Sequence, residues 1–221
     1  MLIFCELTQM EQSISLLGVR LLMMHPNTTA GYINPDKGIG IVATAPLPVG
    51  TIVYVYDSME IVVRPDDPRL KSPLYSQLFD HFSFSDKHGN RVVCWDHGRY
   101  MNHCCNPNTL SMTNGCNIVI RDIAAGEELT EDYGLWRMVK PVPLVCQHAN
   151  CRKVVGLADN PMIADHCDIL IKQAIMHWRN VPQAMLPILD EATITELDTF
   201  LHTGTGYQSV STLLCAAWDV R

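Results

Sequence analysis

The first two thirds of this 221-residue chain contain short runs of β-branched and aromatic residues, broken by glycine and proline. Of all features of the sequence, this pattern restricts the possible folds most. Residues 39–63 read IGIVATAPLPVGTIVYVYDSMEIVV, which predicts two or three short strands around turns at Pro46, Pro48 and Gly50. We therefore expect a mostly β (β-rich α+β) fold.

Glycine-containing turns predict where the hairpins lie. His88-Gly89-Asn90 separates two apolar runs, and Asn114-Gly115 precedes the run CNIVIRDI. Each of these turns predicts a hairpin. Ala125-Gly126 is expected to turn the chain again before Glu127.

The pattern becomes helical after about Asp159. A short helix is expected near residues 72–81, a second in PMIADHCDILIKQAIMHW, and a third from Ala192 to Leu201. Apolar residues at helical spacing in the second are Ile163, Ile169, Leu170, Ala174 and Met176. We expect the tail to pack as an amphipathic helical pair on the β core, with Met162, Met176 and Met185 filling gaps.

Composition excludes several classes of protein. With 48% hydrophobic and 18% charged residues, the chain has the balance of a globular protein. A formal charge of -7 argues against a broad phosphate-binding face, so we expect no direct nucleic-acid contact. Glu6 and Glu11 interrupt the apolar N-terminal segment, which argues against a signal peptide. No stretch approaches the roughly 20 apolar residues of a membrane span, so no membrane partner is expected.

The chain contains nine cysteines, at positions 5, 94, 104, 105, 116, 146, 151, 167 and 215. Their number is odd and their spacing is scattered, which does not fit a secreted disulfide framework. A reducing compartment is the better interpretation. We therefore expect an intracellular protein, either cytoplasmic or nuclear.

The stretch YMNHCCNPN, residues 100–108, gathers several chemically active side chains in one turn. Asn102, His103, Cys104 and Cys105 are residue types that a metal site, a thiol nucleophile or a cofactor loop can use. The stretch alone does not decide among these three.

Four motifs in order carry a family resemblance. They are Gly38-Ile39-Gly40 followed by IVATAPLPVGTIV, then GRYMNHCCNPN (98–108), IRDIAAGEELTEDYG (120–134) and CQHANCR (146–152). Together they resemble the SET-domain protein lysine methyltransferases, whose signatures GxG, RFINHSCxPN, GEELxxDY and a cysteine-containing post-SET segment follow in the same order.

The resemblance implies a SET fold of small β-sheets around a threaded, pseudoknot-like crossing, with a C-terminal helical extension. The boundaries we expect are an N-terminal extension at 1–26, a SET domain at 27–135, a post-SET-like segment at 136–157 and the helical extension at 158–221. The implied activity is S-adenosylmethionine-dependent methylation of a lysine amine on a histone or another protein. The alternative is a catalytically silent SET module that binds a peptide or protein partner.

By the same resemblance, several residues are expected to contact S-adenosylmethionine. They are Lys37, Gly38, Ile39, Gly40, Tyr100, Asn102, His103, Tyr133 and Trp136. For Tyr100 a packing role is also open, and the indole of Trp136 could equally belong to the core. Tyr54 and Tyr56 are candidates for a second channel tyrosine, and the alternation along VYVYD does not show which one points inward.

Tyr133 matches the catalytic tyrosine of the family. A free lysine amine has a pKa of about 10.4 and is protonated at neutral pH, so its lone pair must be freed before it can accept a methyl group. An apolar channel lowers that pKa, and a tyrosine hydroxyl orients the amine. Cys104 and Cys105 are then not required as nucleophiles.

Two departures from the family pattern stand out. Glu131 occupies a position where many histone methyltransferases carry Phe or Tyr. The number of methyl groups that the protein transfers therefore cannot be read from the sequence. The Glu131 carboxylate could bind the substrate ammonium unless it faces away from it. In the post-SET zinc site, Cys105, Cys146 and Cys151 match three of four ligands, whereas the remaining position is Leu144. His148, His166 or Cys167 could complete a zinc site; the alternative is that these thiols are only small core residues.

Overall fold

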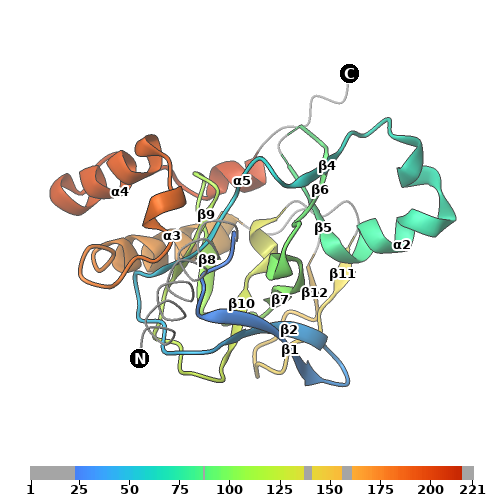
Figure 1. Ribbon diagram of the computed structural model, residues 1–221, viewed down its shortest axis with the longest axis horizontal. Coiled ribbons are helices and arrows are strands. Elements are labelled where there is room, and N and C mark those ends of the chain that lie inside the picture. Colours follow the sequence, from blue (N-terminus) through green and yellow to red (C-terminus); the bar gives the residue numbers. More distant parts are fainter. Residues whose placement is uncertain (1–22, 87, 137–140, 156–160, 216–221) are drawn as a thin grey trace, which may run out of the picture.

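The computed structural model describes residues 23–86, 88–136, 141–155 and 161–215. Most of the predicted N-terminal extension, with Glu6 and Glu11, therefore lies outside the described residues, as do Cys5 and the side chains of Met162 and Cys215. Within the described ranges the strands form four small sheets, and helices lie at two separate edges of the sheet region (Figure 1). The fold is β-rich, as predicted.

The first sheet has the strand order β1-β2-β10-β7 and contains β1 (Thr28–Asn34), β2 (Gly38–Ala43), β10 (Glu128–Glu131) and β7 (Asn102–His103). The second has the order β3-β9-β8 and contains β3 (Ile52–Val55), β9 (Cys116–Val119) and β8 (Thr109–Ser111). The third has the order β4-β6-β5 and contains β4 (Ile61–Val63), β6 (Arg91–Val93) and β5 (Ser83–Ser85). A short pair joins β11 (Val142–Pro143) to β12 (Val154–Val155).

The α-helices are α2 (Pro73–Phe82), α3 (Pro161–Ile175), α4 (Glu191–Thr203) and α5 (Ser211–Cys215). Short 3₁₀ helices cover Pro68–Lys71, His97–Tyr100, Tyr133–Leu135 and Leu186–Ile188. Asp190 begins α4 by accepting a hydrogen bond from the Thr193 N–H at 2.6 Å, and Gly204 ends it in the left-handed conformation at φ 70°. No helix in the described part of the chain has both the length and the apolar character needed to cross a membrane.

The hairpins and helices predicted from local signals are confirmed. β5 and β6 flank His88-Gly89-Asn90, and β8 and β9 flank Asn114-Gly115. The predicted helices correspond to α2, α3 and α4. The sequence did not predict β1, whose residues TTAGYIN include poor strand formers. This strand forms by pairing with β2, from Thr28 opposite Ala43 to Asn34 opposite Gly38.

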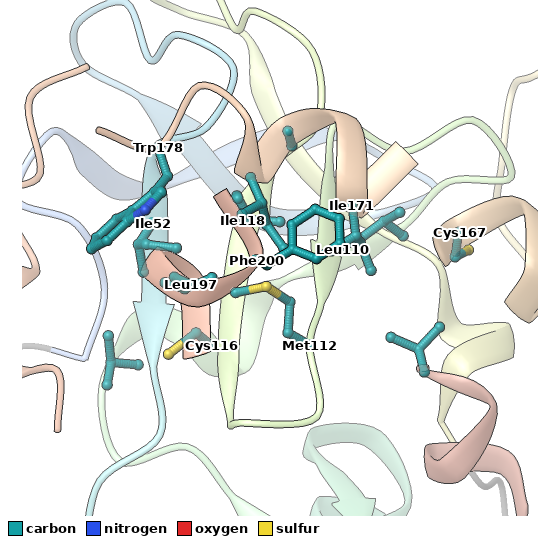
Figure 2. Close-up of a cluster of buried hydrophobic side chains, with 14 of the residues drawn as sticks. Ile52, Leu110, Met112, Cys116, Ile118, Cys167, Ile171, Trp178, Leu197 and Phe200 are labelled. Carbon is teal, nitrogen blue, oxygen red and sulfur yellow. The ribbon is translucent and has the colours of Figure 1, made fainter. Parts of the chain in front are cut away.

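The larger hydrophobic core joins the tail helices to the β3-β9-β8 sheet. Ile171 of α3 and Phe200 of α4 lie over Leu110 and Ile118 of the sheet (Figure 2). Trp178, in the turn after α3, is fully buried in the same cluster. The helical tail and the β region therefore share one core, as the amphipathic pattern predicted. Met185 fills a gap in it at 1% exposure, but the predictions for Met176 and Ile169 are wrong, because these side chains are 46% and 55% exposed.

A second core lies under the first sheet. Its buried members include Met23, Met24, Ile41, Leu47 and Leu129. Met23 and Met24 are held there because both backbone N–H groups donate to the Asp96 carboxylate, at 3.0 and 3.1 Å. The segment before β1 is thereby fixed to the segment that leads into β7.

Ile171→Ala is expected to lower the free energy of unfolding by about 2–5 kcal/mol, because it removes a fully buried side chain from the core shared by helix and sheet. The matched control is Ile169→Ala on the same helix, where the side chain is 55% exposed. This control should change stability by less than about 0.5 kcal/mol. Urea denaturation followed by tryptophan fluorescence measures both variants, and equal losses would contradict the shared core.

Candidate active site

Three of the sequence motifs lie on adjacent strands of the first sheet. β10 contains the ELTE motif. It pairs with β2, which contains the GIG motif, and with β7, which consists of Asn102 and His103. The β10–β7 pairing is parallel, with Thr130 opposite Asn102 and Glu131 opposite His103. The fold therefore brings together backbone segments that are far apart in the sequence.

Asn108 stabilises the crossing of the two segments. Its side chain accepts a hydrogen bond from the Thr130 N–H at 2.8 Å and donates to the Glu128 carbonyl at 2.8 Å. Its own N–H donates to the Thr130 carbonyl at 3.3 Å, and the residue is 1% exposed. Cys104 adds a further bond from its N–H to the Glu131 carbonyl at 2.9 Å. The last asparagine of YMNHCCNPN thus holds the backbone crossing together.

Glu128 links the GIG turn to the Asn-His pair. Its carboxylate forms an ion pair with Lys37 Nζ at 2.6 Å and accepts a hydrogen bond from Asn102 Nδ2 at 2.9 Å. Asn102 Nδ2 also donates to the Ile39 carbonyl at 3.1 Å. The sequence contained Glu128 within a family motif but suggested no role for it, because its partners lie 91 and 26 residues away.

Gly40 is required by packing within the protein. A Cβ at this position would lie 2.8 Å from Asn102 Nδ2, 2.8 Å from Glu128 Oε1 and 2.6 Å from Ile33 Cγ1. Gly38 has open space around it but adopts φ 71°, a conformation that favours glycine. The GIG motif therefore allows Asn102 and Glu128 to approach β2 closely.

His103 lies between Tyr133 and Cys105 and uses both ring nitrogens. Nδ1 accepts a hydrogen bond from the Tyr133 N–H at 3.1 Å, and Nε2 lies 3.1 Å from Cys105 Sγ. Burial lowers the pKa of His103 to about 4, so the imidazole is neutral at physiological pH. Because Nδ1 accepts, Nε2 carries the ring proton and donates it to the Cys105 sulfur.

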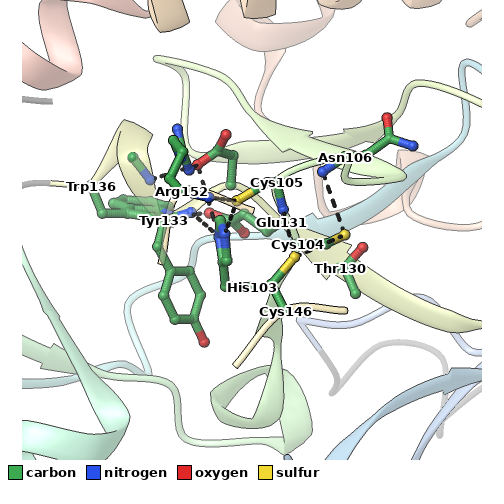
Figure 3. A network of polar contacts seen from close by, with 12 residues as sticks. His103, Cys104, Cys105, Asn106, Thr130, Glu131, Tyr133, Trp136, Cys146 and Arg152 are labelled. Atoms are coloured by element: carbon green, nitrogen blue, oxygen red, sulfur yellow. Dashed lines mark hydrogen bonds and ion pairs between the residues drawn. The ribbon is translucent and has the colours of Figure 1, made fainter. Parts of the chain in front are cut away.

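Tyr133 follows β10 directly, and its hydroxyl donates to the Met101 carbonyl at 2.5 Å. Its ring packs against the His103 ring with centroids 5.4 Å apart (Figure 3). Burial raises the pKa of Tyr133 well above its ordinary value, so the phenol stays protonated. A neutral hydroxyl whose proton is already engaged presents its lone pairs to an incoming N–H donor.

Glu131 points into a buried polar network. Its carboxylate accepts hydrogen bonds from Ser111 Oγ at 2.9 Å, from Asn117 Nδ2 at 2.7 Å and from the indole N–H of Trp136. Burial raises the pKa of Glu131 above its ordinary value, although these donors lower it in part. The carboxylate is occupied within the protein by these three donors.

Trp136 is oriented by this bond and packs on Phe84, with ring centroids 4.6 Å apart. Tyr100 contacts Phe82 edge-on, with ring centroids 5.7 Å apart. Tyr54 points inward and donates to Glu60 at 2.5 Å, whereas Tyr56 is 43% exposed. Of the two candidate channel tyrosines, Tyr54 is therefore committed to a buried pair with Glu60, a carboxyl whose pKa burial raises to about 7.

The predicted metal ligands partly converge. Cys105 and Cys146 form a group with His103 in which all ligand atoms lie within 4.8 Å of one another. The thiol of Cys151 lies beside that of Cys146. Among the described residues, this group contains none of the proposed fourth ligands His148, His166 and Cys167. His166 is exposed, and Cys167 is buried in the helical core.

Comparison with known proteins identifies the central part of the chain. Residues 38–134 match the family model described as SET domain. A 65-residue stretch covering 26% of the chain is 38% identical to histone-lysine N-methyltransferase set1 of Dictyostelium discoideum. A 133-residue stretch covering 54% is 29% identical to histone-lysine N-methyltransferase Set2 of Drosophila melanogaster. The chain spans only 4% and 6% of the length of these two relatives.

Solved structures with a similar arrangement include two of KRYPTONITE. One is its complex with mCHG DNA and SAH, with a TM-score of 0.42 and 20% identity over 60% of this chain and 29% of that one. The other is its complex with mCHH DNA, an H3(1-15) peptide and SAH, with a TM-score of 0.44 and 21% identity over 60% of this chain and 30% of that one.

Glu131→Gln is expected to flatten the pH dependence of stability. The folded pKa of Glu131 is raised above the ordinary 4.5, so its contribution to stability is fully present below that value and is lost as pH rises through the raised pKa. Glutamine does not titrate. The unfolding free energy of the variant minus that of the wild type should therefore increase with pH across this window, as measured by urea denaturation at a series of pH values. Parallel curves would contradict a buried, titrating Glu131.

Proposed function

We propose that this chain, whose residues 38–134 match the SET-domain family model, is an S-adenosylmethionine-dependent protein-lysine N-methyltransferase. The observation that supports the proposal is the adjacency of β2, β10 and β7, which puts the GIG turn, the Asn102-His103 pair and Tyr133 around one place. The relatives named above are histone-lysine methyltransferases, so a histone lysine is the first substrate we propose, and with it a nuclear location.

The cofactor would lie along the first sheet. On one side of the proposed cofactor site lie backbone groups of residues 37–40. The contacts proposed on the other sides are Tyr100, Asn102, His103, Tyr133 and Trp136. The chain fits this role because the Lys37–Glu128–Asn102 contacts hold the GIG strand and the Asn-His strand in a fixed spacing. When bound, S-adenosylmethionine supplies an electrophilic methyl group for an in-line displacement by a neutral amine.

Tyr133 would orient the lysine. Its hydroxyl proton is engaged by the Met101 carbonyl, so an oxygen lone pair can accept an N–H of the substrate amine and direct the nitrogen lone pair toward the methyl carbon. The proton that the amine must lose before attack goes to solvent, because an apolar channel disfavours the ammonium form. Glu131 does not stabilise the ammonium, since its carboxylate faces Ser111 and Asn117.

A catalytically silent SET module that binds a peptide or protein partner is the competing function. The main reason to consider it is the carboxylate at position 131, where many histone methyltransferases carry an aromatic residue. The buried network around Glu131 weakens this argument for a silent module, because Ser111 and Asn117 hold the carboxylate away from the proposed position of the substrate amine. The two functions differ in one observable, which is methyl transfer by a chain that binds the cofactor.

Tyr133→Phe is expected to reduce kcat by at least about 100-fold, because it removes the hydroxyl that orients the amine. The assay is incorporation of labelled methyl groups from S-adenosylmethionine into core histones and whole-cell lysate. The matched control is Tyr207→Phe, which removes another hydroxyl engaged inside the protein, donated to Asp168 at 2.6 Å in the helical tail. The control should stay within about twofold of wild type, since only a hydrogen bond worth about 1 kcal/mol of stability is lost.

No transfer by the wild type to any protein, despite cofactor binding, would favour the silent module. No cofactor binding at all would overturn the proposed methyltransferase.

Asn102→Ala is expected to weaken cofactor binding by about tenfold or more, because it removes the side chain that joins Ile39 to Glu128; a tenfold change corresponds to about 1.4 kcal/mol. Isothermal titration calorimetry with S-adenosylhomocysteine measures the affinity without turnover. Asn180→Ala, at an exposed position after α3, serves as the control and should bind as the wild type does. Equal affinities for all three proteins would place the cofactor elsewhere.

A further inference from the structure

The indole ring of Trp136, one of the proposed cofactor contacts, is oriented by the buried carboxylate of Glu131. The indole N–H donates to Glu131 Oε1, and the backbone N–H of Trp136 donates to the Tyr133 carbonyl at 3.0 Å (Figure 3). Glu131 is 4% exposed, whereas Trp136 is only partly buried. The N–H edge of the ring is therefore held inside the protein while part of the residue stays accessible.

The Glu131 carboxylate is itself held by two strands of the second sheet. Asn117 Nδ2, on β9, donates to Glu131 Oε2 at 2.7 Å, and Ser111 Oγ, on β8, lies 2.9 Å from Glu131 Oε1. Ser111 Oγ also lies 2.9 Å from Asn117 Oδ1, so the three side chains form a closed network. All three are buried, and a buried polar network with its partners in place is rigid. The carboxylate is therefore a fixed acceptor for the indole.

Phe84 limits the tilt of the indole from the third sheet. It lies on β5, and its ring centroid is 4.6 Å from that of Trp136, with the two ring planes inclined by 44°. A tryptophan side chain has only two torsions to fix. A hydrogen bond at the ring edge and an aromatic contact at the ring face together fix both.

An indole that is ordered in advance contributes more to the affinity for a ligand than one that is ordered only on binding. Ordering a free side chain costs conformational entropy, and that cost reduces the affinity. A carboxylate is suited to this task because a hydrogen bond to a charged acceptor is stronger than one to a neutral acceptor. An apolar side chain at position 131 would instead leave the Trp136 indole N–H and the Asn117 amide without this acceptor.

We propose that Glu131 is a positioning residue for cofactor binding, which orders the Trp136 indole before S-adenosylmethionine binds. The inference rests on the proposed methyltransferase function, in which Trp136 contacts the cofactor. It gives the carboxylate at position 131 a role that involves neither the substrate amine nor a proton transfer. Glu131 acts through Trp136 and does not itself touch the cofactor.

The hydrogen bond is tested by the indole N–H resonance of Trp136 in a ¹H–¹⁵N NMR spectrum of the full chain, recorded without cofactor. The resonance is identified by its absence in Trp136→Phe. A proton that is donated to a carboxylate resonates downfield, so Glu131→Leu should move this resonance upfield. Glu131→Gln keeps an oxygen acceptor and should move it less.

The affinity for S-adenosylhomocysteine, measured by isothermal titration calorimetry, tests the positioning role without turnover. Glu131→Leu should bind about tenfold more weakly, because the hydrogen bond that orders the indole is lost, and Glu131→Gln should recover most of the affinity. The matched control is Asp168→Leu, which removes another buried carboxylate with internal donors, the Tyr207 hydroxyl at 2.6 Å and the Val210 N–H at 2.9 Å. This control should bind within about twofold of the wild type, because the lost contacts are confined to the helical tail.

A double-variant cycle separates the positioning role from a general loss of stability. In the Trp136→Phe background there is no indole N–H to hold, so Glu131→Leu should cause no further loss of affinity. Additive losses, an unchanged indole resonance in Glu131→Leu, equal weakening by Asp168→Leu, or wild-type affinity in Glu131→Leu would each overturn the inference and leave the proposed methyltransferase in place. A wild-type chain that binds no S-adenosylhomocysteine would instead overturn the proposed function and this inference with it.

Discussion

The parallel pairing of β7 with β10 is the constraint on which the rest of the structure depends. A parallel pair cannot be closed by a tight turn, so the chain between them must leave the sheet and return. It does so through the β8–β9 hairpin, and Asn108 fixes the crossing with three hydrogen bonds to the β10 backbone. Because the crossing is buried, removing that side chain would leave several backbone groups without partners.

This crossing lets one turn contact two separate parts of the chain. On one side of it, Asn102 contacts the GIG strand through Ile39 and Glu128. On the other, Cys104 and Cys105 face Cys146. His103 lies between them, with one ring nitrogen on the Tyr133 backbone and the other on the Cys105 sulfur. The proposed methyl-transfer site and the Cys105–Cys146 pair are therefore neighbours joined by one neutral imidazole.

Buried carboxylates in this region are held by specific donors. An ionised carboxylate away from water is costly unless it is paired or hydrogen-bonded. Glu128 is paired with Lys37, Asp132 accepts from the Arg152 side chain and from the Gly134 N–H at 2.7 Å, and Glu131 accepts from Ser111 and Asn117. Each of these carboxylates therefore has its partners within the protein, and the Tyr133 hydroxyl donates to the Met101 carbonyl.

The sequence by itself determined the features that depend on neighbouring residues. Gly89 and Gly115 marked hairpins, and apolar periodicity marked α3 and α4. The ordered motifs predicted a SET domain at residues 27–135, and residues 38–134 match the SET-domain family model. Features that depend on distant partners were decided only in the tertiary structure. The pairing of β1, the role of Glu128, the inward orientation of Tyr54 and the direction of Glu131 each rest on contacts that no local pattern specifies. The same holds for Cys104, whose sulfur lies 3.9 Å from that of Cys146, 42 residues away. Local signals are read from adjacent side chains, whereas a site is made by the backbone path that brings separate segments together.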